Sequence, residues 1–175
     1  MRLTSAIVSG ISLALLLSAC GGNGDGDDSP TGVRTPPKVA TLGPFVGECG
    51  HVTDDEIRQI GGVTGTLQVY RNSVGCHWKS SGSSAEVTFA SYRGSPLARE
   101  EAWEALQGRS PEEITVAGKT GFQAYAVTLG GELCDFAIQL DDDFFEWSFA
   151  GPVPAGQTAC TVTRQFAELT MSRLG

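Results

Sequence analysis

Two histidines stand beside cysteines in this sequence, an arrangement that could hold a metal ion. His51 follows Cys49 after one glycine, and His77 directly follows Cys76. Two cysteines and two histidines can bind Zn2+ tetrahedrally. Against this, adjacent side chains on a strand point to opposite faces, and the cysteines of an exported chain are oxidised, so their sulfurs are no longer thiolate ligands. We therefore predict no metal site and no cofactor.

Other reactive patterns are weaker. Asp141-Asp142-Asp143 could bind Ca2+ through oxygens, but the run lacks the spaced ligands of an EF-hand loop and is typical of a solvated hairpin tip. The sequence has no Gly-x-Ser-x-Gly elbow for a nucleophilic serine. Gly118-Lys119-Thr120 lacks the Gly-x-x-x-x spacing of a phosphate loop. We predict that the protein is not an enzyme and has no catalytic residues.

The N-terminus has the order of an export signal. Arg2 precedes an apolar run from Ile7 to Leu17, and the small residues Ser18-Ala19 follow it. At about a dozen residues, the run is too short to span a bilayer of roughly 30 Å. Because Cys20 stands directly after the small pair, the segment resembles a bacterial lipobox, which implies cleavage before Cys20 and its acylation, with palmitate among the chains. The alternative is an ordinary cleaved signal peptide with an incidental cysteine.

We divide the chain into a signal peptide over 1–19, a lipidated cysteine with a flexible tether over 20–42, and one globular domain over 43–175. The tether is rich in Gly, Asp and Pro and has too little apolar surface to offset its ordering entropy. Its expected span is roughly 25–30 Å. This arrangement predicts an extracytoplasmic domain held at the cell membrane by its lipid.

The net charge limits the possible partners. Cleavage of the predicted signal peptide would remove Arg2. The remaining chain has 11 basic and 20 acidic residues and a formal charge of −9. Nucleic acid requires a basic face, so we predict no nucleic-acid partner. Anionic lipid likewise attracts basic patches, so Cys20 is the predicted membrane contact.

Four cysteines remain beyond Cys20, an even number in an exported chain, which predicts two disulfides. Spacing allows three pairings. We favour Cys49–Cys76 with Cys134–Cys160, because these are two loops of similar length, each within one half of the chain.

Three helices are expected. Thr53 and Glu56 form a capping box for a short helix that Gly61-Gly62 ends. A second helix lies between Ser95 and Gly108, with its apolar residues turned inward and Arg99, Glu100 and Glu104 in water. The third covers about 159–174 and presents an apolar stripe to the sheet.

Apolar alternation with a period of two predicts the strands between these helices. It is clearest around Cys76 and Trp78, along 133–140 and at Phe145, Trp147 and Phe149. Gly130-Gly131 joins two of the strands as a hairpin. The fold class is therefore α+β: a single antiparallel sheet of about five to six strands with helices packed on one face.

The cysteine framework, together with the lipobox, the polar tether, Cys76-His77-Trp78 and Val116-Ala117-Gly118, resembles the domain-of-unknown-function 3558 family, which are actinobacterial envelope lipoproteins. The resemblance covers about residues 43–175. It implies an envelope location and a shared fold, and it implies no activity.

Three aromatic residues, Tyr92, Tyr125 and Phe144, fall opposite the predicted core positions and are candidates for an exposed interface. We assign the protein as a membrane-anchored lipoprotein that acts by binding another envelope protein or polymer. The alternative is a small-molecule or lipid-binding sensor or carrier, which needs a cavity of roughly a few hundred Å3 between sheet and helices. An envelope enzyme ranks last.

Overall fold

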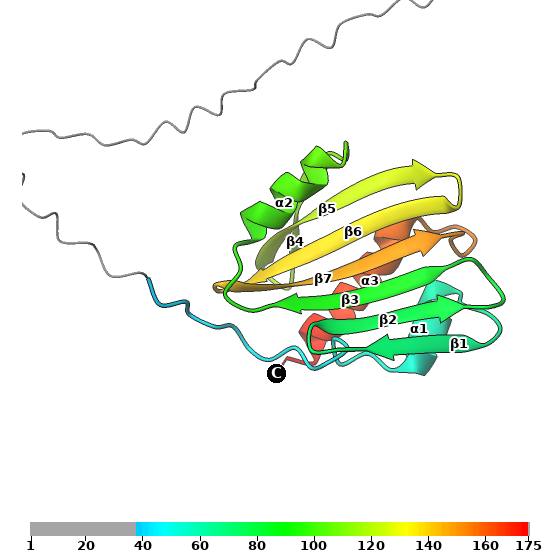
Figure 1. The fold of residues 1–175 in the computed structure, drawn as a ribbon, viewed down its shortest axis with the longest axis horizontal. Helices are drawn as coiled ribbons and strands as arrows, with labels where there is room; N and C mark the ends of the chain where they lie inside the picture. Colours follow the sequence, from blue (N-terminus) through cyan, green and yellow to red (C-terminus); the bar gives the residue numbers. More distant parts are fainter. Residues whose placement is uncertain (1–37, 175) are drawn as a thin grey trace, which may run out of the picture. The chain divides into compact units, whose positions relative to one another are not determined.

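A seven-stranded antiparallel sheet organises residues 38–174, the part of the chain that the computed structural model describes (Figure 1). The predicted signal peptide, Cys20 and the tether as far as residue 37 lie outside the described residues. The elements are α1 Asp54–Gly61, β1 Leu67–Arg71, β2 Gly75–Ser80, β3 Glu86–Tyr92, α2 Leu97–Leu106, β4 Pro111–Val116, β5 Lys119–Thr128, β6 Gly131–Leu140, β7 Asp143–Gly151 and α3 Ala159–Ser172. None of the helices in this part is long and apolar enough to cross a membrane.

The strands lie in the order β1-β2-β3-β7-β6-β5-β4, so the sheet has seven strands where five to six were expected. The strand that the sequence pattern missed is β1 at one edge. Only Leu67 and Val69 of this strand pack against the core, while Tyr70 on its other face is exposed. An edge strand with so little burial carries a weak apolar alternation.

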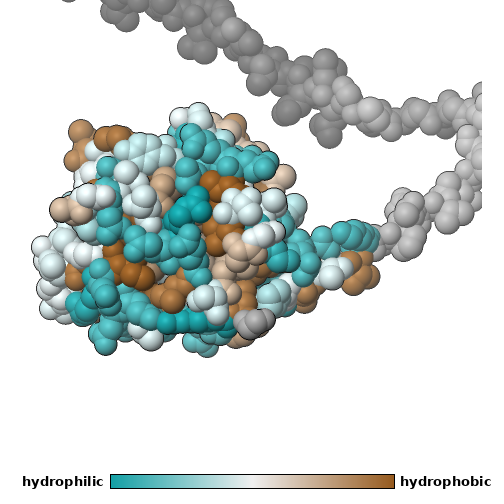
Figure 2. All heavy atoms as spheres, turned by 180° about the vertical axis from the view of Figure 1, so that it is seen from behind, coloured by the Kyte–Doolittle hydropathy of each residue, from teal (hydrophilic) through white to brown (hydrophobic). Residues whose placement is uncertain are grey.

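Helices cover both faces of the sheet, so the expectation of helices on one face is wrong. In Figure 1, α1 and α3 lie behind the sheet and α2 lies in front of it. The large core belongs to the α3 side, where Trp147 stacks between Trp78 and Phe166, with ring centroids 5.8 Å and 4.8 Å away. Seen from behind in Figure 2, the side of α1 and α3 exposes apolar residues in small separate groups.

The two disulfides join Cys49 to Cys76 and Cys134 to Cys160, the pairing favoured from the sequence. The first connects the loop before α1 to β2, and the second connects β6 to the first turn of α3. Each closes a loop with a sequence separation of 26 or 27, and in the chain-entropy model a loop of this size contributes about 3.5 kcal/mol.

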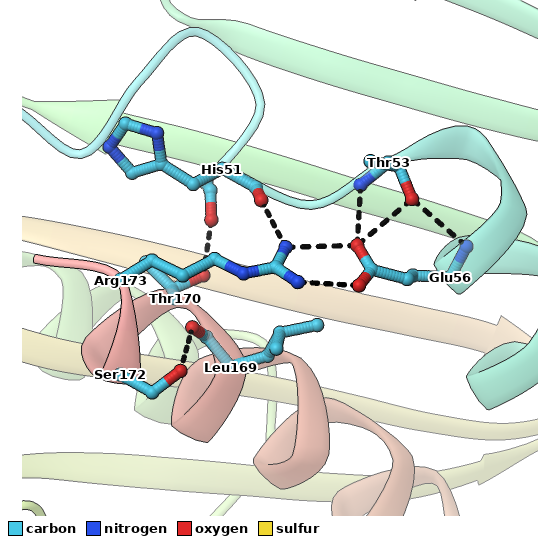
Figure 3. Close-up of polar contacts among 8 residues, drawn as sticks. His51, Thr53, Glu56, Leu169, Thr170, Ser172 and Arg173 are labelled. Carbon is cyan, nitrogen blue, oxygen red and sulfur yellow. Dashed lines mark hydrogen bonds and ion pairs between the residues drawn. The ribbon is translucent and has the colours of Figure 1, made fainter.

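A polar network fastens α1 to the end of α3 (Figure 3). The predicted capping box is present: Thr53 accepts from the Glu56 amide, and Glu56 accepts from the Thr53 amide at 2.9 Å. The Arg173 guanidinium donates to both oxygens of Glu56 and to the carbonyl of His51. Thr170 donates to the carbonyl of Gly50 at 2.8 Å.

Gly50 is required at that position. Its φ is +66°, and a Cβ there would stand 2.6 Å from the Trp147 ring. A side chain would therefore displace the central ring of the aromatic stack.

The acidic turn between β6 and β7 is not the solvated hairpin tip that the sequence predicts. Asp143 is buried and accepts from the amides of Gly43 at 2.9 Å and Gly94 at 2.7 Å. Asp142 accepts from the Lys38 ammonium at 2.9 Å. These carboxylates fasten the N-terminal segment and the entry to α2 to the sheet.

The network around Arg173 predicts an acid-dependent loss of stability. Hydrogen bonds from Arg173 and from the Thr53 amide lower the pKa of Glu56 from 4.5 to about 2. A depressed carboxyl pKa stabilises the fold above the unfolded value and loses that effect as pH falls through the folded value. We expect Arg173→Ala to lower the urea midpoint at neutral pH, and the difference from wild type to shrink between about pH 4.5 and 2.

The matched control is Arg164→Ala, which removes a looser surface pair with Glu168 at 4.0 Å. It should leave the pH dependence of unfolding unchanged. A difference in urea midpoint between Arg173→Ala and wild type that stays constant through this acid range would contradict the role given to the Arg173–Glu56 pair.

Candidate functional site: the sheet face under helix α2

Helix α2 lies on the sheet with its polar side inward, the reverse of the sequence expectation. Glu104 is the one residue of this helix that is fully buried, at 2% exposure, and Leu97 and Glu100 share its side. Trp103 is 53% exposed and Leu106 is 80% exposed. The helix therefore presents an aromatic and an aliphatic side chain to solvent and carboxylates to the sheet.

One guanidinium explains this orientation. Arg109, just beyond the end of α2, pairs with Glu104 and with Asp135 of β6, the latter at 2.5 Å. Ser148 of β7 donates to Asp135 and, at 3.3 Å, to Glu146. A buried carboxylate needs such partners because desolvation without them is costly.

The cluster holds more negative than positive charge. Its four carboxyl groups are Glu100 and Glu104 on α2, Asp135 on β6 and Glu146 on β7, and Arg109 alone bridges two of them. Burial raises the pKa of Glu104 to about 7, and the neighbouring charge of Asp135 adds to the effect. Burial and the same neighbour raise the pKa of Glu146 to about 8.

The aromatic ring of Tyr92 lies next to these carboxyl groups. It stacks on Phe144 with ring centroids 4.5 Å apart. Burial, followed by the charges of Glu146 and Glu100, raises the pKa of Tyr92 to about 12. Its hydroxyl therefore stays protonated and available as a donor at physiological pH.

Unpaired polar atoms gather around the same helix. Among residues 38–174, five buried side-chain polar atoms lack a hydrogen-bond partner, and four of them belong to Ser95, Glu104, Arg109 and Glu146. Glu104 Oε2 is in ionic contact with Arg109 without forming such a bond. Folded proteins satisfy nearly all buried polar atoms, and the ion pair with Arg109 satisfies Glu104 Oε2, so Ser95, Arg109 and Glu146 each keep one polar atom without a hydrogen bond.

Three surface grooves adjoin the cluster. One of about 440 Å3 runs along α2 past Glu100 and Trp103, and one of about 460 Å3 passes Tyr92 and Ser95. Arg99 lines both of these. A third, of about 300 Å3, crosses the sheet beside Tyr70 and His77 and shares Val74 with the second. The first two grooves therefore meet at Arg99, and the second and third meet at Val74.

The predicted interface residues fall in different places. Phe144 is 2% exposed beneath Tyr92 and α2, so its expected exposure is wrong. Tyr92 is partly buried at the groove, and Tyr125 is exposed on the α3 side beside Cys134. The sequence missed Trp103, because its helical pattern assigns that residue to the core. The reversed orientation depends on charges outside the helix.

The cysteine and histidine residues do not form one site. Cys49 and Cys76 are bonded to each other. His77 lies on the α2 side of the sheet and contacts Glu86 at 3.0 Å. His51 lies in the loop before α1, near the carbonyl of Phe45. In the described chain no group of three His, Cys, Asp or Glu side chains is arranged to hold a metal ion.

The raised carboxyl pKa values predict a loss of stability toward alkaline pH. Between about pH 4.5 and 8 the folded state binds more protons at Glu146 than the unfolded state does, so stability falls as pH rises. The slope approaches roughly 1.4 kcal/mol per pH unit for each titrating group. We expect Glu146→Gln to be more stable than wild type at about pH 8 and to show a shallower slope in urea unfolding.

Glu168→Gln, at an exposed position on α3, is the matched control and should follow the wild-type pH profile. Parallel profiles for wild type and Glu146→Gln would show that Glu146 does not titrate in this range.

The chain matches one protein family and several curated relatives. A family model described as "Protein of unknown function (DUF3558)" covers residues 15–173. "Putative lipoprotein LprB" of Mycobacterium tuberculosis is 33% identical over 98% of this chain and 95% of its own length, and the Mycobacterium leprae protein of that name is 34% identical over 74% and 71%. No solved structure matches significantly. The chain belongs to the DUF3558 family of proteins of unknown function.

Proposed function

We propose that this protein is a lipoprotein anchored through Cys20 at the extracytoplasmic side of the cell membrane, and that its domain binds another envelope component. The lipoprotein names of its relatives support the anchoring. The proposed binding surface, here named the α2 face, consists of Tyr92, Arg99, Glu100 and Trp103.

The observation that carries the proposal is the outward position of Trp103. A helix that only covered a core would turn its tryptophan inward, because burial of apolar surface stabilises by about 25 cal/mol per Å2. Here the indole stays half-exposed and lines the groove along α2. Tryptophan, tyrosine and arginine are the residue types that most often dominate binding energy at interfaces, and the α2 face carries all three.

The packing of the domain argues against the two alternatives, a ligand carrier and an enzyme. A carrier needs an enclosed apolar cavity, but the space between the sheet and α3 is filled by the stacked rings of Trp78, Trp147 and Phe166. An acid catalyst needs an accessible carboxyl group with a raised pKa. Glu104 and Asp135 are shielded from solvent and bound to Arg109, which favours a binding role over catalysis.

Anchoring is tested by Cys20→Ala in an actinobacterial host. Without the cysteine the precursor lacks its acylation site, so we expect the protein to leave the membrane fraction. The measurement is immunoblotting of membrane, soluble and culture fractions. Retention of the variant in the membrane at the wild-type level would contradict lipid anchoring at Cys20.

Binding is tested by photo-crosslinking in cells. A benzophenone amino acid replaces Trp103 in the full-length lipoprotein, and the matched control carries it at Gln165, which is exposed on α3. We expect ultraviolet light to produce discrete higher-mass adducts from position 103 that Leu106→Asp suppresses, and none from position 165. Equal adducts at both positions, or none at position 103, would overturn the proposed surface.

A further inference from the structure

We propose that the hairpin of β5 and β6 joins two copies of this chain. Residues 125–129 of one copy pair as an antiparallel strand with the same residues of the second copy, about a two-fold axis at Val127. This surface is separate from the α2 face. Tyr125 lies opposite Cys134, which is bonded to α3, so the Tyr125 side chain points to the α3 side of the sheet. The self-association goes beyond the proposed binding role and does not depend on it.

The last residues of β5 have a strand neighbour on one side only. β4 pairs with β5 as far as Ala124, and the hairpin of β5 and β6 extends past β4 (Figure 1). The turn Ala117-Gly118 has positive φ at both residues, the two-residue type that closes with a hydrogen-bonded pair. From Lys119 in that pair, every second residue of β5 directs its N–H and C=O groups to the β4 side, and Tyr125 and Val127 belong to this set. Within residues 38–174 no backbone hydrogen bond reaches these groups, so the edge can accept another strand.

The side chains at this edge are apolar, and no charge lies near them in the sequence. Tyr125 is 43% exposed, Val127 is 73% exposed and Leu129 is fully exposed. Between Lys119 and Glu132 the chain has no charged residue, although its net charge is −8. Natural proteins commonly protect an unpaired sheet edge with proline or charged residues. β4 begins with Pro-Glu-Glu and has this protection, whereas the end of β5 lacks it.

The end of β4 determines the register of the second copy. Pro111 occupies the position opposite Ala124, so the vacant positions begin opposite Tyr125. The second copy fills them as far as its own turn, which places its Leu129 opposite Tyr125 and its Val127 opposite Val127. In this register the exposed apolar side chains of both copies meet on one face of the joined sheets, and the unpaired backbone groups of each edge pair with those of the other.

The contact between the two copies is small. Stable complexes typically bury about 1,200–2,000 Å2 of surface, and five residues from each copy cover less than this. We therefore expect a reversible dimer. A disulfide that traps it is a more sensitive measurement than sedimentation of the diluted protein.

The test places single cysteines in the full-length lipoprotein, which an actinobacterial host expresses with two different tags. Directly opposite residues of a hydrogen-bonded pair have Cα atoms about 5.5 Å apart, within the range of a disulfide. After oxidation with copper–phenanthroline, non-reducing gels measure the dimers that carry both tags. We expect Val127→Cys to give at least tenfold more dimer than the matched control Gln165→Cys, which is exposed on α3.

The register gives a readout that random collisions would not produce. Two copies of Tyr125 are four positions apart along the joined strands, roughly 14 Å. Tyr125→Cys alone and Leu129→Cys alone should therefore give no more dimer than Gln165→Cys, whereas their co-expression should give a dimer that carries both tags. Circular dichroism verifies that each variant is folded.

A second measurement leaves the edge without an added cysteine. A benzophenone amino acid at position 125 should form an adduct of twice the chain mass on ultraviolet irradiation. Val127→Lys should suppress this adduct, because it places like charges opposite each other, and Gln165→Lys should not.

Three results would overturn the inference. The first is a folded Val127→Cys that gives no more dimer than Gln165→Cys. The second is equal dimer from Tyr125→Cys alone and Val127→Cys alone, since that excludes the register. The third is a position-125 adduct of another mass without the double-mass adduct, which would show that a strand of a different protein occupies the edge.

Discussion

The contact of Arg109 with Glu104 and Asp135 determines the character of one whole side of this molecule. Helix α2 buries little apolar surface, because Leu97 is its main inward-facing apolar residue and is only partly buried. Its N-cap, Pro96, makes no side-chain cap bond. An ion pair therefore decides which side of α2 meets the sheet, and that choice places Trp103 and Leu106 in solvent. Removing one partner of a buried pair typically costs about 3–5 kcal/mol, since the other charge is left uncompensated.

The two sides of the sheet are held by different kinds of contact. On the α3 side, stacked rings, both disulfides and the network around Arg173 hold α1, α3 and the strands together. Those contacts do not involve the α2 face. The domain can therefore keep an ionic, incompletely paired surface, because its stability comes from the opposite side. Apolar packing and disulfides are concentrated on the α3 side, and the buried carboxyl groups are concentrated on the α2 side.

Local signals in the sequence predicted most of the helices and strands. Long-range contacts determined the features that the sequence did not predict. The capping box at Thr53 and the alternation along β6 and β7 follow from neighbouring residue types, and the structure contains both. The favoured cysteine pairing came from the similar length of the two loops, and the structure contains it as well. The orientation of α2 depends on Asp135, which is 26 residues from Arg109 along the chain. No helical periodicity contains that information.

The other differences share this origin. Phe144 is buried because α2 and Tyr92 cover it, and the acidic turn is structural because the N-terminal segment returns to it. Edge strand β1 lacks a clear pattern because only two of its residues, Leu67 and Val69, pack against the core and both are only partly buried. For the candidate site, the sequence shows which carboxylates exist and cannot show that they converge, since they come from α2, β6 and β7.

The cost of the acidic cluster is itself an argument about its role. Well-packed apolar residues in place of a buried ionic group are often neutral or stabilising, so stability alone does not require Glu146 there. Its carboxyl group is buried near three others, and its pKa of about 8 means that ionisation at neutral pH works against folding. Strongly perturbed titratable groups concentrate at functional sites, and structural networks of ionic groups perturb pKa values as well. The carboxyl groups under α2 therefore cost stability, which the disulfides and the aromatic stack on the α3 side supply.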